Sequence, residues 1–575
     1  MRTESSPTHK FDRMLRSAQR FEEVWRRSNQ QNFEYYDGEQ WTENEKAEIE
    51  SRGQQPTVIN TIRPTIDMVC AQEVERRADI QVCGREESDD NMAQLLTALL
   101  KHVFDECNFE YYHSQCFKEA SIGGRSWLEA TVKTDERGKG MISVQPVPWE
   151  NVYLDPYSRK PDASDARFII KIKWVDRDVL KVLYKDKAEK IDSVFDDDYK
   201  GQEYEAQNHA SERMDDWYYD PKTKRVKVCE CWYTKPVKEP VSIKNEVTGK
   251  EEKKVIFKNK VHYVIFSDEI ILTGSADDDN LNVNPLKVDI FPLVPIYCMR
   301  DRFGRPKGIV RDLVDIQDQI NKLNSKFLWT VAANRVIMEE GAARDEDEVR
   351  EEMQKPDGLV ILNDGGLSRM RIDDKYRDLS YMSNHLNFLL QTEQRISGVN
   401  DSMLGLGGTN ERSGIMQNTR INQGAAMQTT ILENMYFSKQ RIALVLLRLI
   451  GHFYTDYRVV RITQPNGLTD NYEFNIPERD DAGNPTGTIL NKIDDTLYYD
   501  VVLKKVPPFN SMRDRMLTIF SEILKSNVIP APIAGKMMIM LSDMPNKEDL
   551  ILELENFYQA QAQAAPVQPT PNPPV

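Results

Sequence analysis

Residues 308–331, GIVRDLVDIQDQINKLNSKFLWTV, have the residue pattern of one long helix. Apolar side chains recur at three- and four-residue spacing, which places them on one helical face: Ile309, Leu313, Ile316, Ile320, Leu323, Phe327 and Val331. The opposite face carries Asp318, Gln319, Lys322 and Lys326. The pattern therefore predicts an amphipathic helix with one apolar face and one solvent-exposed polar face.

Three further segments follow this helix in the chain. Residues 334–378 break into short pieces with thirteen acids and eight bases, a net charge of −5. A second helix is predicted over 379–396. After a loop at 397–411, a helical pattern runs from Arg412 to about Tyr454, which is more than ten turns. The order predicts two helices flanking a compact acidic insert.

The loop at 397–411 has two interpretations. Four of the twelve residues at 397–408 are glycine, which adopts conformations barred to other residues. One interpretation is a plain connector between helices. The length of the loop and its apolar residues Met403, Leu404 and Leu406 favour a functional loop.

The regions on either side indicate an α+β chain. Helices are expected over 9–31, 62–77 and 92–107, and short β-branched or alternating runs predict strands from about 126 to 300 and over 458–505. A capping pair, Ser511 with Asp514, predicts one more helix. The Pro-rich end, 559–575, lacks core-forming residues and is expected to be disordered.

Composition limits the classes of protein to which this chain can belong. The net charge of −16 argues against a surface that grips nucleic acid, because such affinity comes from Lys and Arg neutralising phosphates. No apolar run approaches the roughly 20 residues that span a bilayer, and the first residues lack the apolar core of a secretory signal. We therefore expect a protein made and used in a cytoplasm, with no membrane partner.

Motifs for catalysis, metal binding and cofactor binding are missing from the sequence. There is no phosphate-binding G-x-x-x-x-G-K-[ST], no H-E-x-x-H and no G-x-S-x-G. Cys229 and Cys231 form a lone C-x-C, which favours reduced, buried thiols over a zinc site. The acidic runs at 196–198 and 277–279 are interpreted as solvated loops. No enzyme activity, metal or cofactor is expected.

Five groups of residues resemble motifs of the portal proteins of tailed bacteriophages, most closely those of short-tailed phages. They occur in the family's order over roughly residues 35–530: Tyr36-x-Gly38-x-Gln40-Trp41; Asn60, Pro64 and ERRADI at 75–80; Trp149-x-x-Val152, Asp155-Pro156, Asp162 and Asp165-Ala166-Arg167; Gly308-x-x-Arg311-x-x-x-Asp315-x-Gln317-x-x-x-Asn321; and Gly398-Val399-Asn400-Asp401-x-x-x-Gly405 followed by Ser413-Gly414. Each motif alone is weak, but their order and spacing together are fairly specific.

This resemblance implies the portal fold. Its parts would be an N-terminal α/β wing (1–305), a first stem helix (306–333), a small α/β clip (334–378), a second stem helix (379–396), a tunnel loop (397–411), a long helix with wing strands (412–505), a helical crown (506–558) and a disordered tail (559–575).

The resemblance also implies the function and the partners. Usually twelve copies would form a ring at one capsid vertex around a channel through which double-stranded DNA is packaged and ejected. The ring would contact the major capsid and scaffolding proteins, dock the terminase large subunit at the clip, and later bind head-to-tail adaptor and tail proteins. Two alternatives stay open. One is another connector or adaptor ring, although adaptors are usually far smaller. The other is a terminase-type packaging enzyme, against which the missing motifs count.

Three sets of candidate site residues follow from the resemblance. An acidic wall with few bases would let DNA slide, and twelve copies around a duplex of about ten base pairs per turn leave no preferred register. Lys322 and Lys326 would line the stem channel, or they are ordinary solvated residues. The tunnel-loop candidates are Asn400, Asp401, Met403, Leu404, Thr409 and Asn410. The clip candidates for docking a basic partner are Glu346, Asp347, Glu348, Glu351 and Glu352.

Overall fold

The computed structural model describes most of the chain up to residue 504. The described residues are 7–84, 90–134, 138, 140–195, 218–244, 251–332, 336–353, 358–372, 376–401, 403–404, 423–424, 426–463, 469–479, 485–490, 500–504 and 554. They fall into two units, one of residues 1–71 and 80–503 and one of residues 72–79 and 504–575. The crown expected at 506–558, apart from residue 554, and the tail expected at 559–575 lie outside the described residues.

Five helices form the first part of the chain: α1 (His9–Asp37), α2 (Glu43–Ser51), α3 (Ile62–Glu75), α4 (Asp90–Glu106) and α5 (Phe109–Gly123). Gly38, with φ at 96°, ends α1 in the left-handed conformation that glycine adopts readily. Thr42 and Glu45 form a reciprocal capping box at the start of α2. Local chemistry therefore sets the bend between α1 and α2.

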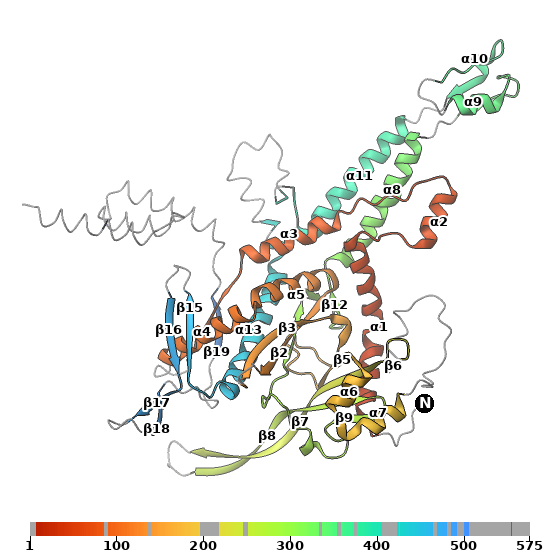
Figure 1. The fold of residues 1–575 in the computed structure, drawn as a ribbon. Coiled ribbons are helices and arrows are strands. Elements are labelled where there is room, and N and C mark those ends of the chain that lie inside the picture. Colours follow the sequence, from red (N-terminus) through yellow and green to blue (C-terminus); the bar gives the residue numbers. More distant parts are fainter. Residues whose placement is uncertain are drawn as a thin grey trace, which may run out of the picture. The chain divides into compact units, whose positions relative to one another are not determined.

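Two antiparallel sheets follow (Figure 1). The smaller has the order β10-β2-β3, from β2 (Arg125–Thr134), β3 (Gly140–Val147) and β10 (Leu293–Tyr297). The larger has the order β4-β5-β7-β8-β9, with β6 beside β7. Its strands are β4 (Val152–Leu154), β5 (Phe168–Asp176), β6 (Tyr219–Asp220), β7 (Arg225–Lys244), β8 (Glu251–Ser267) and β9 (Ile270–Thr273).

The remaining elements complete the first unit. They are α6 (Arg177–Leu183), α7 (Ala188–Val194), β11 (Met299–Arg300), β12 (Pro306–Lys307), α8 (Val314–Ala332), β13 (Val336–Met338), α9 (Glu346–Glu352), α10 (Gly366–Arg369), β14 (Met370–Ile372), α11 (Tyr376–Ser397), α13 (Thr429–Phe453), β15 (Arg458–Thr463), β16 (Thr469–Phe474), β17 (Ile476–Arg479) and β18 (Pro485–Leu490). Two further strands, β1 (Asp79–Cys83) and β19 (Asp500–Lys504), have residues in both units.

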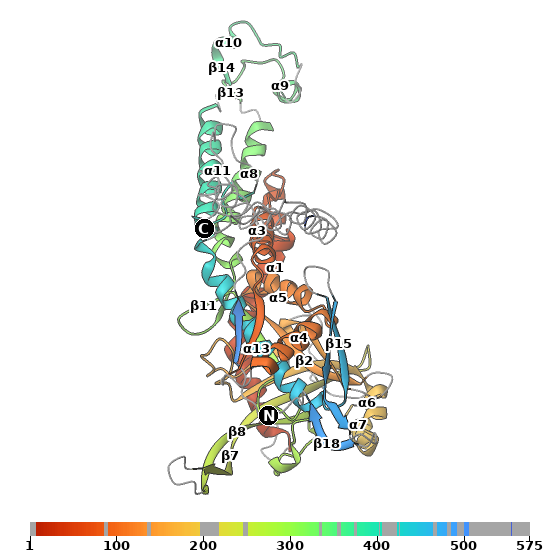
Figure 2. The same cartoon turned by 90° about the vertical axis from the view of Figure 1, so that its left-hand side faces the viewer.

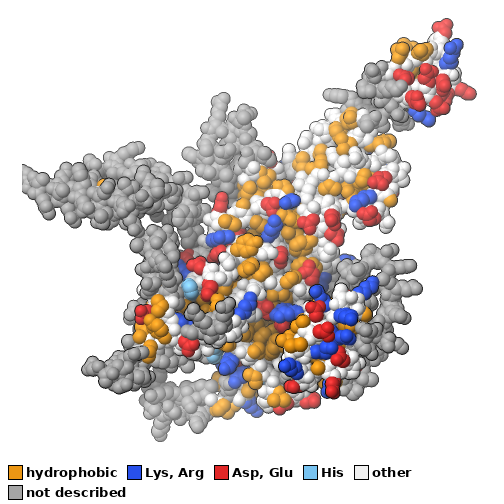
Figure 3. All heavy atoms as spheres, viewed as in Figure 1, with side chains coloured by type: hydrophobic (Ala, Val, Ile, Leu, Met, Phe, Trp, Pro, Cys, Tyr) orange, Lys and Arg blue, Asp and Glu red, His pale blue; other side chains and the backbone are white. Residues whose placement is uncertain are grey.

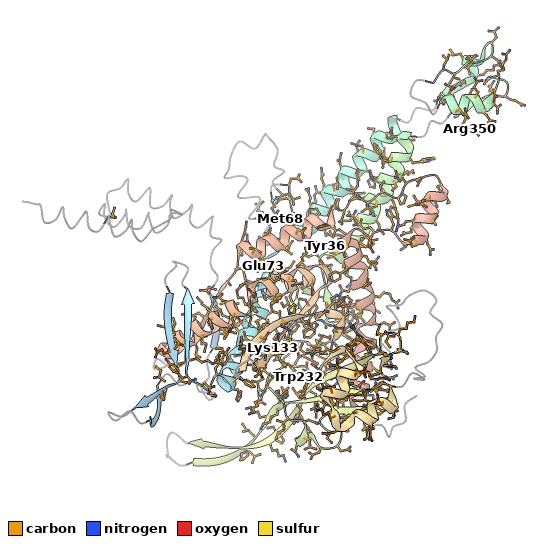
Figure 4. The ribbon with its side chains drawn as sticks, viewed as in Figure 1. Tyr36, Met68, Glu73, Lys133, Trp232 and Arg350 are labelled. Carbon is orange, nitrogen blue, oxygen red and sulfur yellow. The ribbon has the colours of Figure 1, made fainter. Side chains whose placement is uncertain are left out.

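The main hydrophobic core lies around the smaller sheet. Trp127 of β2 and Leu446 of α13 are fully buried in it, beside apolar residues of α3, α4 and α5. A second core covers the larger sheet, where the N-terminal part of α1 inserts Phe11 against Phe266. Trp232 of the larger sheet, labelled in Figure 4, belongs to the main core.

A buried ion cluster also connects the two sheets. Lys171 of β5 is 3% exposed and forms ion pairs with Glu129 of β2 and, at 2.7 Å, with Glu230 of β7. Although desolvation opposes ionisation, Lys171 and Lys173 lower the pKa of Glu230 below its ordinary value. Each buried charge therefore has an opposite charge beside it.

The mixture of helices and antiparallel sheets confirms the α+β class. Helix α11 lies close to the range expected for it, whereas α8 begins at Val314, six residues later than the expected start at Gly308, after a 3₁₀ turn at Val310–Asp312. Helix α1 continues past the expected end at 31, because Tyr35 and Tyr36 are buried rather than in a turn. Helices α2, α5, α6 and α7 were not expected, and the aromatic and β-branched residues of the last three resemble strand composition.

One helix is not continuous where continuity was expected. Over the described part of 412–454, residues 423–424 and 426–427 are helical, Gln428 is a turn residue, and α13 begins at Thr429. The Gln428 side chain is 2% exposed and its Nε2 donates to Ser397 O at 3.5 Å. This contact with the end of α11 accompanies the break.

Candidate functional site

Helices α8 and α11 form the candidate stem, and they lie side by side in Figures 1 and 2. Their contact is a small apolar cluster. Ile316, Ile320 and Leu389 are buried in it, and Leu323, Leu386 and Leu390 are partly buried against it. Three residues of the apolar face predicted within 308–331, Ile316, Ile320 and Leu323, thus face α11, whereas Ile309 and Leu313 lie in the main core and Val331 is exposed.

A second face of α8 carries a ladder of buried polar side chains, Gln317, Asn321 and Ser325. Their spacing of four residues puts them on one side of the helix. This side faces the extended segment 57–61 between α2 and α3. Ser325 Oγ accepts a hydrogen bond from Thr57 N at 3.1 Å.

Gln317 binds this segment at two residues. Its Oε1 accepts from Thr61 N at 3.1 Å and from Thr61 Oγ1 at 2.7 Å, and its Nε2 donates to Ile59 O at 2.6 Å. Segment 57–61 thereby pairs its main chain with helix side chains, as it would with a neighbouring strand.

Asn321 extends the ladder to the end of α1. Its Oδ1 accepts from Ile59 N at 3.0 Å, and its Nδ2 donates to Gln40 Oε1 at 2.6 Å. Gln40 in turn donates to Tyr35 O at 2.8 Å, and Asn60 Nδ2 donates to Tyr36 O at 3.0 Å. Residues from three of the portal-like motifs therefore meet at one place and fix the base of the stem.

Six large apolar side chains described on the two stem helices are exposed. Leu328, Trp329 and Val331 of α8 are 43%, 42% and 55% exposed, and Tyr381, Phe388 and Ile396 of α11 are 80%, 56% and 46% exposed. Exposed apolar residues gathered on one pair of helices are typical of a surface that another protein covers.

The two candidate lysines of the stem have different surroundings. Lys322 Nζ lies 3.4 Å from Glu45 Oε1 and 3.9 Å from Asp318 Oδ2, so carboxylates of the same chain offset its charge. Desolvation of Glu45 is outweighed by hydrogen bonds from Thr42 and by the charge of Lys322, and the pKa of Glu45 is lowered. The side chain of Lys326 is exposed.

Four of the six tunnel-loop candidates are described. Asn400 starts a turn, because its Oδ1 and O accept from Met403 N at 3.1 and 2.9 Å. Asp401 is exposed and accepts from Gln394 Nε2 at 2.6 Å. Leu404 packs against the main core. Thr409 and Asn410 lie outside the described residues.

A close approach between Gly398 and Gly424 holds the start of the loop. Gly398 has φ at 74°, and a Cβ on it would lie 3.1 Å from Met427 Cβ. A Cβ on Gly424 would lie 2.7 Å from Gly398 O. Gly398, Asn400 and Met403 therefore lie against Gly424 and Met427.

The candidate clip is a small α/β module. Strands β13 and β14 pair antiparallel, and Ala342, Ala343 and Val349 form its buried apolar residues. Asp345 caps α9 by accepting from Asp347 N at 2.9 Å. Acids in the first turn of α9 also suit the positive end of the helix dipole.

The five candidate acids of the clip divide into two kinds. Glu346, Asp347, Glu348 and Glu351 are exposed on α9, next to Arg350, which Figure 4 labels. Glu352 is partly buried and its Oε2 accepts from Leu359 N at 3.0 Å. Figure 3 shows the acidic side chains gathered on this module. Four of the five thus have solvent-exposed side chains, although Asp347 lies 3.7 Å from Arg350.

Sequence reasoning placed Gln317 and Asn321 in a motif but gave them no role. The signal was present, since Gln317-x-x-x-Asn321-x-x-x-Ser325 puts three hydrogen-bonding side chains on one helical face. Their partners, however, lie more than 250 residues earlier in the chain.

Within the described ranges, no three His, Cys, Asp or Glu side chains are grouped as metal ligands. Cys229 and Cys231 are buried free thiols in β7, and burial raises the pKa of Cys231. Among the helices that the structure describes, we found none with an apolar stretch sufficient to span a bilayer.

Comparison with known proteins agrees with this geometry. The family model of the phage P22-like portal protein matches residues 12–574. A portal protein of Helicobacter pylori bacteriophage KHP30 is 24% identical over 537 residues, which cover 92% of this chain and 79% of that protein. The chain therefore belongs to the P22-like portal protein family, and its function is that of a phage portal protein.

Proposed function

We propose that twelve copies of this chain close into a ring in which α8 and α11 surround a channel for double-stranded DNA. The observation that carries the proposal is the apolar surface left on this helix pair, formed by Leu328, Trp329 and Val331 of α8 with Tyr381 and Phe388 of α11. In a ring, the stem helices of neighbouring copies cover these side chains. Repeating head-to-tail contacts close such a ring when the rotation between copies fits.

The charges suit a channel through which DNA slides. A chain of net charge −16 offers few bases to hold phosphates, and Glu45 and Asp318 offset the charge of Lys322. Of Lys322 and Lys326, Lys326 is the better candidate for a ring of weak positive charge formed by one lysine from each copy. The contacts with DNA come from residues after Leu404, including Thr409 and Asn410, rather than from Met403, which lies against Gly424, and Leu404, which packs against the main core.

The clip docks the packaging motor. Its exposed acids on α9 suit a basic face of the terminase large subunit first, and of head-to-tail adaptor and tail proteins later. The ring itself occupies one capsid vertex and contacts the major capsid and scaffolding proteins during assembly in the host cytoplasm. It binds no cofactor and catalyses no step of packaging.

The experiment is a native mass measurement of purified protein with a stem variant. Leu328→Ser combined with Trp329→Ser should raise the concentration needed for ring formation by at least about tenfold, because half-exposed large side chains at an interface carry much of its affinity. The matched control is Val179→Ser with Val182→Ser on α6, which removes apolar side chains of similar exposure, 49% and 67%, outside the stem. Equal ring formation by both variants would contradict the proposed stem contact.

A further inference from the structure

Strands β7 and β8 continue as a bare two-stranded ribbon beyond the larger sheet, visible in Figures 1 and 2. The β7–β8 arm consists of residues 235–244 and 251–260, paired from Lys235 with Lys260 to Lys244 with Glu251. On the outer side of β7, pairing with β5 ends at Tyr233, and on the outer side of β8, pairing with β9 starts at Ile265. Within the described strands, the arm thus has no third strand.

The arm exposes three consecutive apolar side chains. Val255 and Phe257 are 62% and 70% exposed on one face, and Ile256 is 41% exposed on the other. An isolated hairpin is at best marginally stable in water, so ten residue pairs, roughly 30 Å long, need a covering surface. Pro236 and Pro240 have no N–H and disfavour the addition of another strand along β7, so that the arm offers its two faces and the outer edge of β8 to a partner.

A second surface has the complementary chemistry. The aspartate loop, residues 275–284, holds the run 277–279 and contains no Lys or Arg. Its burial pattern is inverted: Asn282 and Asn284 are 0% and 6% exposed, whereas Leu281 and Val283 are 65% and 71% exposed. Its surface is therefore acidic and apolar.

Hydrogen bonds hold the aspartate loop in this inverted form. Asn282 Oδ1 accepts from Ser275 N at 2.6 Å, and Asn282 Nδ2 donates to Tyr233 Oη at 2.7 Å and to Ser275 O at 2.9 Å. Asn284 Nδ2 donates to Val288 O at 2.6 Å. Residues 279–281 form a 3₁₀ turn and Val283 bridges His262 of β8, so that Leu281 and Val283 stay exposed while both asparagines are held inward. The loop presents them without further rearrangement.

We propose that the β7–β8 arm of one copy packs on the aspartate loop of the next copy, which rests on the ring proposed above. The charges favour a second copy of this chain as the partner of the arm. The strands of the arm carry seven Lys and three Glu, a net charge of +4, which leaves a net charge of −20 on the rest of the chain. Both surfaces stay exposed within a single copy, so they do not cover each other there. An arm that contacts a different patch on its neighbour is a head-to-tail contact, which repeats around a ring.

The test is photo-cross-linking within the assembled protein. Phe257 is replaced by p-benzoylphenylalanine, and rings are formed from a mixture of ¹⁴N- and ¹⁵N-labelled copies, so that cross-links between copies are distinguished by mass. We expect residue 257 to cross-link to the tryptic peptide 261–287 of another copy, within 277–283. The matched control carries the same photo-reactive residue at Tyr157, which is 73% exposed, and should not cross-link to this peptide.

A second variant tests the apolar part of the contact. Leu281→Ser with Val283→Ser should lower the yield of that cross-link about tenfold, as expected when two apolar side chains are lost from an interface, and leave thermal unfolding of the chain unchanged. Rings that form normally but show cross-links from residue 257 only within one copy, or elsewhere, overturn the arm contact alone. Protein that forms no rings overturns both this contact and the proposed function.

Discussion

Replacing Asn321 by Leu should detach the base of the stem from segment 57–61. Leu has a similar volume but makes no hydrogen bonds. Three are lost, from Ile59 N at 3.0 Å, to Gln40 Oε1 at 2.6 Å and from Gln317 Nε2 at 3.1 Å. At about 1 kcal/mol for each bond, the free energy of opening this region should fall by about 3 kcal/mol.

The assay is native-state hydrogen exchange, because a chain of this size need not unfold in one step. About 3 kcal/mol corresponds to a loss of protection of roughly 100-fold at the amides of Ile59 and Thr61. The control is Lys326→Met, an exposed substitution on the same helix. Unchanged protection of both amides in Asn321→Leu would refute the structural role assigned to the polar ladder.

Three further predictions concern other parts of the chain. Burial, and to a lesser degree the charge of Glu150, raises the pKa of Glu119 from 4.5 to about 7. The folded state therefore keeps a proton that the unfolded chain releases, and stability falls as pH rises between these values. Glu119→Gln should raise stability by up to about 3 kcal/mol at pH 8 and change it little at pH 4.5, measured as Tm against pH. Lys171→Met should lower the free energy of unfolding by about 3 kcal/mol, since it removes the cation beside the buried Glu129 and leaves Glu230 with Lys173 alone, whereas equal Tm values would mean that the cluster is not coupled to folding. The four exposed clip acids are Glu346, Asp347, Glu348 and Glu351. Replacing all four by Gln should weaken motor binding in a salt-dependent way and preserve the ring, while Glu352→Gln should not weaken binding. Normal motor binding by the fourfold variant would exclude α9 as the docking surface.

Periodicity predicted the stem helices because the spacing of apolar residues along one helix is a property of the local sequence. The three- and four-residue spacing of Ile316, Ile320 and Leu323 needs only one apolar partner, and α11 supplies it. The break at Gln428 could not be predicted this way, since the apolar spacing continues through it. Its contact with Ser397 depends on how α11 and α13 meet in space.

The aspartate loop shows where alternation is insufficient. Leu281, Asn282, Val283 and Asn284 alternate as a strand would, and the usual interpretation turns the apolar residues inward. The opposite holds because Asn282 binds Ser275 and Tyr233, a contact made by tertiary structure. Likewise, the candidate site residues Met403 and Leu404 were predicted for the channel on residue type, and only their packing beside Gly424 and the main core reveals a second role.

The most direct test of the central claim is single-particle cryo-electron microscopy of the purified protein. The account predicts closed rings of twelve copies, with a mass of about 800 kDa from twelve chains of 66.6 kDa, and a bore surrounded by α8 and α11. Monomers at micromolar concentration in physiological salt, or rings whose bore is lined by the two β-sheets instead of the stem helices, would contradict it.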